Sequence, residues 1–233
     1  MQQRRDRVQW VYAAKNNREL VERYDEWAGE YDRDLCEEFE WIAPQATVGL
    51  FGKYVAPDAK ILDVGVGTGL VGECLVDAGY QDLHGIDLSL GMLDMARRKA
   101  MYRELLQMTL GEALDFADDT FDAVIGVGVF TTGHAPAHAF DELIRITRNG
   151  GYILFTLRTE LHVAGFGPYL DRLETAGRWS LIERSECYRP LPKGEPEVEH
   201  QVWVYRVGVY QMGDVYARSC VTMGISSGRS FRP

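Results

Sequence analysis

The sequence lacks several features that would each indicate a particular class of protein. It has four cysteines, Cys36, Cys74, Cys187 and Cys220, and their wide separation leaves no C-x-x-C pair for a zinc site or a redox dithiol. We expect reduced thiols that are mostly packed. No stretch reaches about eighteen consecutive apolar residues, so none has the length that a membrane-spanning helix needs.

Positive charge is also scarce. The 25 Lys and Arg residues stand against 35 Asp and Glu, which gives a formal net charge of −10. This balance works against a partner that is held through its phosphates, so we expect neither a nucleic-acid nor a membrane partner. Arg4, Arg5 and Arg7 precede an apolar run that is too short for a signal peptide. We expect a cytoplasmic monomer, and a mitochondrial address is the alternative that these arginines leave open.

Strand-like and helical patterns alternate from about residue 60 onward, in a chain of 233 residues that fits one ordinary domain. Gly79 follows one helical run as a candidate C-cap, and Ser89 precedes another as a candidate N-cap. This alternation predicts a parallel, doubly wound sheet. Strands are predicted at 60–66, 83–89, 121–130 and 152–158, and helices at 70–79, 91–106 and from 139 to a stop at 149–151.

The two ends of the chain show different patterns. Residues 180–191 and 200–210 predict two antiparallel strands that close the sheet as a long hairpin, and 211–233 has no sustained period. We expect a loosely ordered tail there. Near the N-terminus an apolar stripe predicts one helix whose face belongs to the core by default. Its members are Leu20, Tyr24, Trp27, Tyr31 and Leu35.

The segment "KILDVGVGTGLVGECL", residues 60–75, contains two glycine fingerprints. Gly67, Gly69 and Gly72 read as G-x-G-x-x-G, which after a strand and before a helix is typical of a dinucleotide site. Gly65, Gly67 and Gly69 instead alternate as G-x-G-x-G. The spacing to a later acidic residue fits both patterns, so it does not decide between them.

Asp63 favours the alternating pattern. Its carboxylate ends an apolar strand directly before the glycines, where it would repel a pyrophosphate. A ligand with an ammonium group, a sulfonium and no phosphate would be attracted instead. S-adenosylmethionine has this combination of groups.

The motifs "LDVGVGTG", "GID", "FDAVIGVGV" and "RNGG" together resemble a class I S-adenosylmethionine-dependent methyltransferase. The segments "YDEWAGEYD", "GTGLVGECLVDAGY" and "GVGVFTTGHAP" resemble the Williams-Beuren-region methyltransferase-like group within that superfamily, over roughly residues 20 to 207. The resemblance implies a Rossmann-like α/β fold: a seven-stranded, mostly parallel sheet with helices on both faces and an antiparallel C-terminal hairpin. We expect an N-terminal helical lid at 1–45, a methyltransferase domain at 46–210 and the tail at 211–233.

The resemblance also implies roles in binding S-adenosylmethionine. Asp63 would serve the ammonium group directly or through water, or else only cap the next helix. Asp87 would accept from two ribose hydroxyls, and Tyr31 would lie near the methionine moiety. Glu112 would accept from the adenine amino group, unless it is a surface acid. The remaining expected contacts are Gly65, Gly67, Thr68, Gly69, Leu88, Met92, Ala113 and Val127, for which a tight turn or core packing is the alternative.

The loop after the fourth strand, 127–138, should face the methyl acceptor. It lacks the Asp/Asn-Pro-Pro-aromatic and Pro-Cys signatures of amide and cytosine methylation, so we expect a small-molecule acceptor. His134 is a candidate general base, or a histidine that only forms hydrogen bonds. We expect Arg158 to be a solvated strand-end arginine rather than a partner of an acidic substrate. No carboxylate cluster indicates a metal site.

We therefore expect S-adenosylmethionine-dependent methyl transfer to a small molecule. Two alternatives remain at this point. A nicotinamide-dependent oxidoreductase would use the other glycine pattern, and a binding protein would keep the cofactor site without a working acceptor site.

Overall fold

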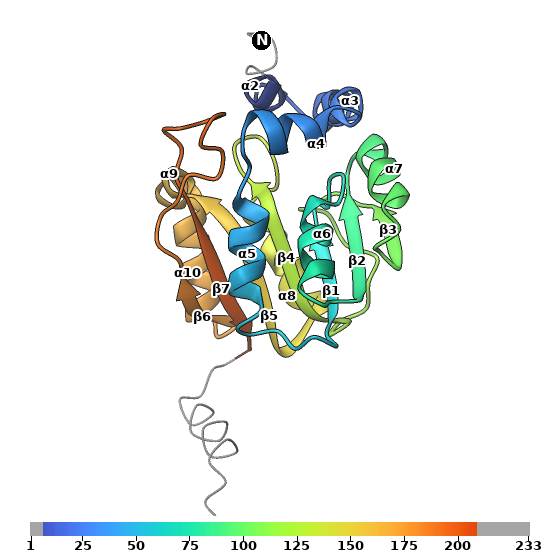
Figure 1. Ribbon diagram of the computed structural model, residues 1–233. Helices are drawn as coiled ribbons and strands as arrows, with labels where there is room; N and C mark the ends of the chain where they lie inside the picture. Colours follow the sequence, from blue (N-terminus) through green and yellow to red (C-terminus); the bar gives the residue numbers. More distant parts are fainter. Residues whose placement is uncertain (1–6, 209–233) are drawn as a thin grey trace, which may run out of the picture.

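The computed structural model describes residues 7–208, and its centre is a seven-stranded sheet (Figure 1). The strand order is β3-β2-β1-β4-β5-β7-β6. The first five strands pair in parallel, and β7 runs antiparallel to both β5 and β6, so the fold class and the closing hairpin are confirmed. The strands are β1 Lys60–Val64, β2 Asp82–Asp87, β3 Glu104–Gln107, β4 Phe121–Phe130, β5 Thr147–Arg158, β6 Trp179–Arg184 and β7 His200–Val207.

Helices cover both faces of this sheet. Ile61 of β1 packs toward α5 and α6, whereas its neighbour Leu62 belongs to the core beneath α8 and α10. The central strands are therefore apolar on both sides, as a parallel sheet with two covered faces requires. The helices are α2 Arg7–Tyr12, α3 Asn17–Trp27, α4 Tyr31–Arg33, α5 Ala43–Phe51, α6 Leu70–Asp77, α7 Leu90–Arg98, α8 Ala139–Ile146, α9 Thr159–Leu161 and α10 Gly167–Thr175, with π-helical turns η1 Asp34–Glu38 and η2 His162–Phe166.

The predicted caps at Ser89 and Gly79 are confirmed, whereas the helix predicted at 91–106 ends at Arg98 and its last residues belong to β3. The Ser89 hydroxyl accepts a hydrogen bond from the Met92 amide at 3.0 Å and so caps α7. Gly79 follows α6 with a φ of 95°, the left-handed conformation that glycine allows at a helix end. β5 differs from the prediction because it begins at Thr147, before the glycine pair. Thr147 pairs with Phe121 across an irregular register, and such a bulge accommodates Gly150 without ending the strand.

The N-terminal helix is broken rather than continuous. α3 ends at Trp27, and a turn precedes α4 and η1, so the prediction of one helix through residue 35 is wrong. Gly29 lies in this turn and disfavours helix continuation. The break brings Asp34 inside, where its carboxylate accepts a hydrogen bond from the Trp27 indole at 3.0 Å. Leu35 still packs in the same apolar cluster as Trp27.

The cysteines are less packed than expected. Cys36 and Cys187 are exposed, because they lie in η1 and in the connection after β6, and Cys74 is half-buried. Cys220 and the predicted tail lie outside the described residues. Within residues 7–208, no helix has the length and apolar character to cross a membrane.

Gly72 in α6 leaves room for the half-buried side chain of Tyr102. A Cβ at this position would lie 2.2 Å from the Tyr102 hydroxyl oxygen. That hydroxyl donates a hydrogen bond to the Asp63 carboxylate at 2.6 Å. The third glycine of the G-x-G-x-x-G pattern is therefore explained by packing and not by a pyrophosphate.

Gly72→Ala should consequently destabilise the protein by about 1–3 kcal/mol, the usual cost of overpacking a closed interior. Gly49→Ala is the matched control, because Gly49 is exposed in α5 with no neighbouring atom within 4 Å of its added Cβ. The control should be neutral or stabilising by up to about 1 kcal/mol. Urea unfolding measures both. Equal stability of the two variants would contradict the packing role of Gly72.

Candidate active site

A cavity of about 380 Å³ lies at the carboxyl ends of β1, β2 and β4, where ligands of open α/β sheets bind. Its walls come from the glycine turn after β1, the end of β2, the loop after β3 and the N-terminal helices that lie above the sheet in Figure 1. Nine of the residues expected from the sequence line it. They are Tyr31, Gly65, Gly67, Asp87, Leu88, Met92, Glu112, Val127 and His134.

Four expected residues lie outside the lining of this cavity. Asp63 is fully buried beneath the glycine turn, where burial raises the pKa of its carboxyl to about 7. Thr68 is also buried and donates its hydroxyl proton to Asp32. Gly69 begins α6, and Ala113 follows Glu112 outside the cavity lining. Asp63, Thr68 and Gly69 therefore support the wall from beneath the glycine turn, whereas Ala113 is exposed beside Glu112.

The glycine turn follows the alternating pattern. Gly65, Gly67 and Gly69 have φ values of 66°, 54° and 91°, all in the left-handed region that favours glycine. A side chain at Gly65 would also strike Val129 of β4 at 2.4 Å. Each glycine of the G-x-G-x-G pattern is therefore required by the backbone itself.

Asp87 joins this turn to the end of β2. One carboxylate oxygen accepts from the Gly67 amide at 2.8 Å, and the other accepts from the Ser89 amide at 2.9 Å. The pKa of this carboxyl is raised to about 6. Burial is the main cause and the nearby Asp25 carboxylate adds to it, whereas the backbone donors act in the opposite direction. The carboxyl lines the cavity, so its remaining lone pairs can accept from hydroxyl donors of a ligand.

His134 and Tyr24 form a polar pair on the opposite wall. The imidazole Nδ1 lies 2.9 Å from the carbonyl oxygen of Thr132, so it must carry the proton. Nε2 therefore accepts from the Tyr24 hydroxyl at 2.7 Å. Burial lowers the pKa of His134 and raises that of Tyr24, which keeps both groups neutral.

Comparisons with known proteins agree with this geometry. Residues 62–155 match a family model described as a methyltransferase domain. The chain is 37% identical over 183 residues to methyltransferase-like protein 27 of Homo sapiens. The aligned residues cover 75% of this chain and 74% of that protein. This chain belongs to the class I S-adenosylmethionine-dependent methyltransferases. The methyltransferase is therefore an enzyme whose cofactor is S-adenosylmethionine.

Other relatives agree with this family. A demethylmenaquinone methyltransferase of Renibacterium salmoninarum is 37% identical over 116 residues, which span 48% of this chain and 46% of that protein. A solved structure described as a putative S-adenosyl-L-methionine-dependent methyltransferase from Methanococcus maripaludis aligns with a TM-score of 0.59 at 15% identity, covering 80% of this chain and 94% of that one. At that identity the structural likeness concerns the fold alone.

The cavity of the methyltransferase fits its cofactor. A volume of about 380 Å³ lies within the range of small-molecule sites. Asp87 offers carboxylate oxygens for hydroxyl donors, Glu112 offers a further carboxylate, and Leu88 and Met92 supply apolar surface. Among residues 7–208, no lysine or arginine lines the cavity, as suits a ligand without phosphate.

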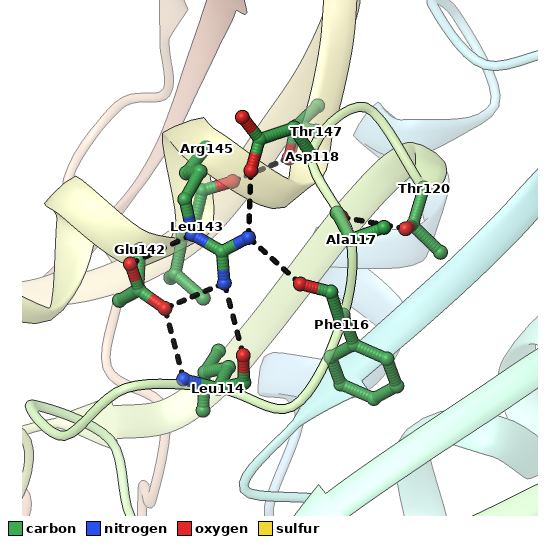
Figure 2. A network of polar contacts seen from close by, with 9 residues as sticks. All are labelled: Leu114, Phe116, Ala117, Asp118, Thr120, Glu142, Leu143, Arg145 and Thr147. Carbon is green, nitrogen blue, oxygen red and sulfur yellow. Dashed lines mark hydrogen bonds and ion pairs between the residues drawn. The ribbon is translucent and has the colours of Figure 1, made fainter.

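Arg145 of α8 holds the segment from Leu114 to Phe116 (Figure 2), which follows Glu112 in the chain. Its guanidinium donates to the carbonyls of Leu114 and Phe116 at 2.9 and 2.7 Å, and to the Glu142 carboxylate at 2.8 and 2.7 Å. These bonds lower the pKa of Glu142 to about 2. Glu142 in turn accepts from the Leu114 amide at 2.8 Å, so both backbone groups of Leu114 are held from α8.

The sequence did not reveal a second, smaller cavity beside the first. It has a volume of about 50 Å³, and Tyr12, Glu195 and His200 are among its polar lining residues. Nearby Arg158 is only 9% exposed because α2 and the connection before β7 cover it. The expectation of a solvated strand-end arginine is therefore wrong. Residues so far apart in sequence share no motif that could have identified this group.

Arg145→Gln should weaken binding of S-adenosylmethionine about tenfold and lower the free energy of unfolding by about 1–3 kcal/mol, because several charge-assisted bonds to the loop are lost. Arg148→Gln is the control, since Arg148 is 58% exposed and pairs with Asp122 near the surface. Such a pair contributes about 0–1 kcal/mol. Isothermal titration calorimetry and urea unfolding measure the two effects. A cofactor affinity unchanged by Arg145→Gln would show that the loop does not need this support.

Proposed function

We propose that this enzyme transfers the methyl group of S-adenosylmethionine to a small-molecule acceptor. The observation that carries the proposal is the enclosure of the site. The cofactor cavity is covered by α3 and α4 and adjoins a second cavity whose lining residues are mostly buried, with Tyr24, Tyr31 and Gly128 in the lining of both. An enclosed space of this kind suits a small acceptor better than a folded macromolecule. We also propose that the enzyme is a cytoplasmic monomer without a nucleic-acid or membrane partner, which its acidic net charge supports.

The residues around the cofactor cavity have distinct proposed roles. The cofactor supplies a methyl group activated by its sulfonium, so the protein mainly aligns the reactants and excludes water. Asp87 accepts from the ribose hydroxyls, Glu112 from the adenine amino group, and Tyr31 lies by the methionine moiety. Asp63 serves the ammonium group directly or through water. Gly65, Gly67, Thr68, Gly69, Leu88, Met92, Ala113 and Val127 complete the proposed set.

The proposed role of Asp87 predicts a pH dependence of cofactor binding. In the free protein burial raises the pKa of this carboxyl to about 6, so the protonated form is favoured below that pH. Hydroxyl donors stabilise the carboxylate, and binding must then release a proton. Affinity for S-adenosylmethionine should rise with pH from about 5 and level off above about 7.

Calorimetry in buffers of different ionisation enthalpy measures this proton release. Asp87→Asn should weaken binding by about 1–3 kcal/mol and flatten the profile below pH 6. If the slope persists in that variant, another group such as Asp63, whose pKa is raised to about 7, carries it. The proposed role of Asp87 in binding the ribose hydroxyls would then be wrong.

We further propose His134 as the group that receives the acceptor's proton, with Tyr24 as the relay. The Tyr24 hydroxyl already donates to Nε2 of His134 at 2.7 Å. An acceptor proton that moves to the Tyr24 oxygen would push the hydroxyl proton onto Nε2. No movement of the histidine is required, although both of its nitrogens are engaged.

His134→Ala should lower turnover about 10²–10⁴-fold with little change in cofactor affinity, the usual size of general-base assistance. Tyr24→Phe should cause a similar loss if the relay operates. Because burial lowers the pKa of His134, the rate should rise at a pH below the usual histidine range. Steady-state kinetics tests both variants. A His134→Ala enzyme that keeps most of its rate would show that alignment alone drives transfer.

Residues 1–45 are proposed to act as a lid over the 46–210 domain, of which the structure describes 7–208. The Asp25 carboxylate of α3 accepts from the Ser89 hydroxyl at 2.5 Å and from the Gly91 amide at 2.9 Å. On α4, Asp32 pairs with Lys99 at 2.8 Å. Amide hydrogen exchange in residues 7–38 should slow when S-adenosylmethionine binds. Equal protection with and without cofactor would show that this segment is a permanent part of the core and not a lid.

A further inference from the structure

The second cavity lies on the acceptor side of the cofactor site. Its lining includes Gly128 at the carboxyl end of β4 and His200 at the start of β7. The rings of Tyr24 and Tyr31 line both cavities, so they form the boundary between them. A group in the second cavity therefore contacts Tyr24, which receives the acceptor's proton in the relay proposed above.

Aromatic rings form much of the second cavity. Tyr12, Tyr24, Trp27, Tyr31 and Trp41 line it. Burial raises the pKa values of Tyr12 and Tyr24, so these phenols are neutral near pH 7. The faces of such rings attract cations, and this attraction is strongest where water is excluded.

Glu195 is the acidic side chain in the described lining of the second cavity. Burial raises the pKa of its carboxyl, and Arg158, Tyr12 and Gln9 act in the opposite direction. The Glu195 side chain lines the cavity and is 7% exposed. Its carboxylate oxygens accept hydrogen bonds from the side-chain amide of Gln9 at 2.8 Å and from the Tyr12 hydroxyl at 3.5 Å. Arg158 lies 4.0 Å from Glu195 and is also paired with Glu160. One guanidinium thus faces two carboxylates. Arg158 itself is not part of the cavity lining.

His200 adds an uncharged hydrogen-bond acceptor to the lining of the second cavity. Burial, and then the Arg158 charge, lower the pKa of His200 to about 4, so its imidazole is neutral near pH 7. Its Nδ1 is buried and has no hydrogen-bond partner among the described residues. A neutral imidazole nitrogen can accept a hydrogen bond from an N–H group.

We propose that the second cavity binds the amine group of the methyl acceptor, as an ammonium ion held by Glu195 between aromatic rings. This inference rests on the proposed methyl transfer and specifies its acceptor class. An anionic acceptor would meet the Glu195 carboxylate directly, whereas an ammonium neutralises it. A volume of about 50 Å³ corresponds to the space of a few water molecules, which suits a small head group.

The transfer step balances for an amine. The ammonium loses one proton to the Tyr24 hydroxyl, and the Tyr24 proton passes to Nε2 of His134. The freed nitrogen lone pair forms a bond to the methyl carbon, while the electrons of the sulfur–carbon bond go to sulfur. The products are a methylated ammonium, which stays paired with Glu195, and the neutral thioether S-adenosylhomocysteine.

The test compares three probes with the same carbon chain: n-butylamine, n-butanol and butyrate. Their affinities are measured by calorimetry on the full chain with S-adenosylhomocysteine present. The amine should bind at least about tenfold more tightly than the alcohol or the acid, the difference that one charge-assisted contact in a buried site provides. Glu195→Gln should reduce amine affinity about 10- to 100-fold, with little change for butanol.

Glu197→Gln is the matched control, because it removes the same charge from an exposed position on the same connection. It should leave the amine preference unchanged. Affinity for S-adenosylmethionine is measured for every variant and reports folding and the cofactor site separately. If the unmodified chain does not bind S-adenosylmethionine, the proposed function itself fails. If it does bind, equal affinities for the three probes, no binding of any probe, or an amine preference that survives Glu195→Gln would each overturn the amine site.

Discussion

The buried Asp87 carboxylate is the contact on which the site depends. Its two oxygens accept from the amides of Gly67 and Ser89, so one side chain fixes the glycine turn after β1 relative to the start of α7. Ser89 also caps α7 and donates its hydroxyl proton to Asp25 of α3. The sheet, the α7 helix and the N-terminal cover are thus connected through three consecutive polar contacts. A carboxylate in this position is costly without donors, and the amides of Gly67 and Ser89 supply them.

The boundary between the two cavities is aromatic and neutral. Tyr24 contacts His134 by a hydrogen bond, and its ring lies beside both Trp27 and Tyr31. In the proposed relay, the Tyr24 hydroxyl carries the acceptor's proton to His134, and these rings limit access of water. A proton route of this kind is compatible with an apolar surrounding because the hydrogen bonds of the His134 pair are internal.

The main features of the fold were evident from local patterns. Alternating strand and helix periods identified the doubly wound sheet, since both patterns follow from burying one or two faces of a regular element. Ser89 and Gly79 marked helix ends correctly because capping depends on the nearest few residues. The break after Trp27 was missed, because the apolar stripe continues through it and the turn is stabilised by the distant Arg7, which pairs with Asp34.

By itself the sequence determined the α/β class, the alternating glycine turn, the acidic strand end at Asp87 and the S-adenosylmethionine family, because each follows from local patterns and their order along the chain. The tertiary structure alone decided that Asp63 binds Tyr102 rather than lining the cavity. It also decided that Arg158 is buried, and that Tyr12, Glu195 and His200 meet around one space. Those residues come from α2, from the connection before β7 and from β7 itself. Their proximity and their shifted pKa values arise only from long-range packing, which a linear pattern does not record.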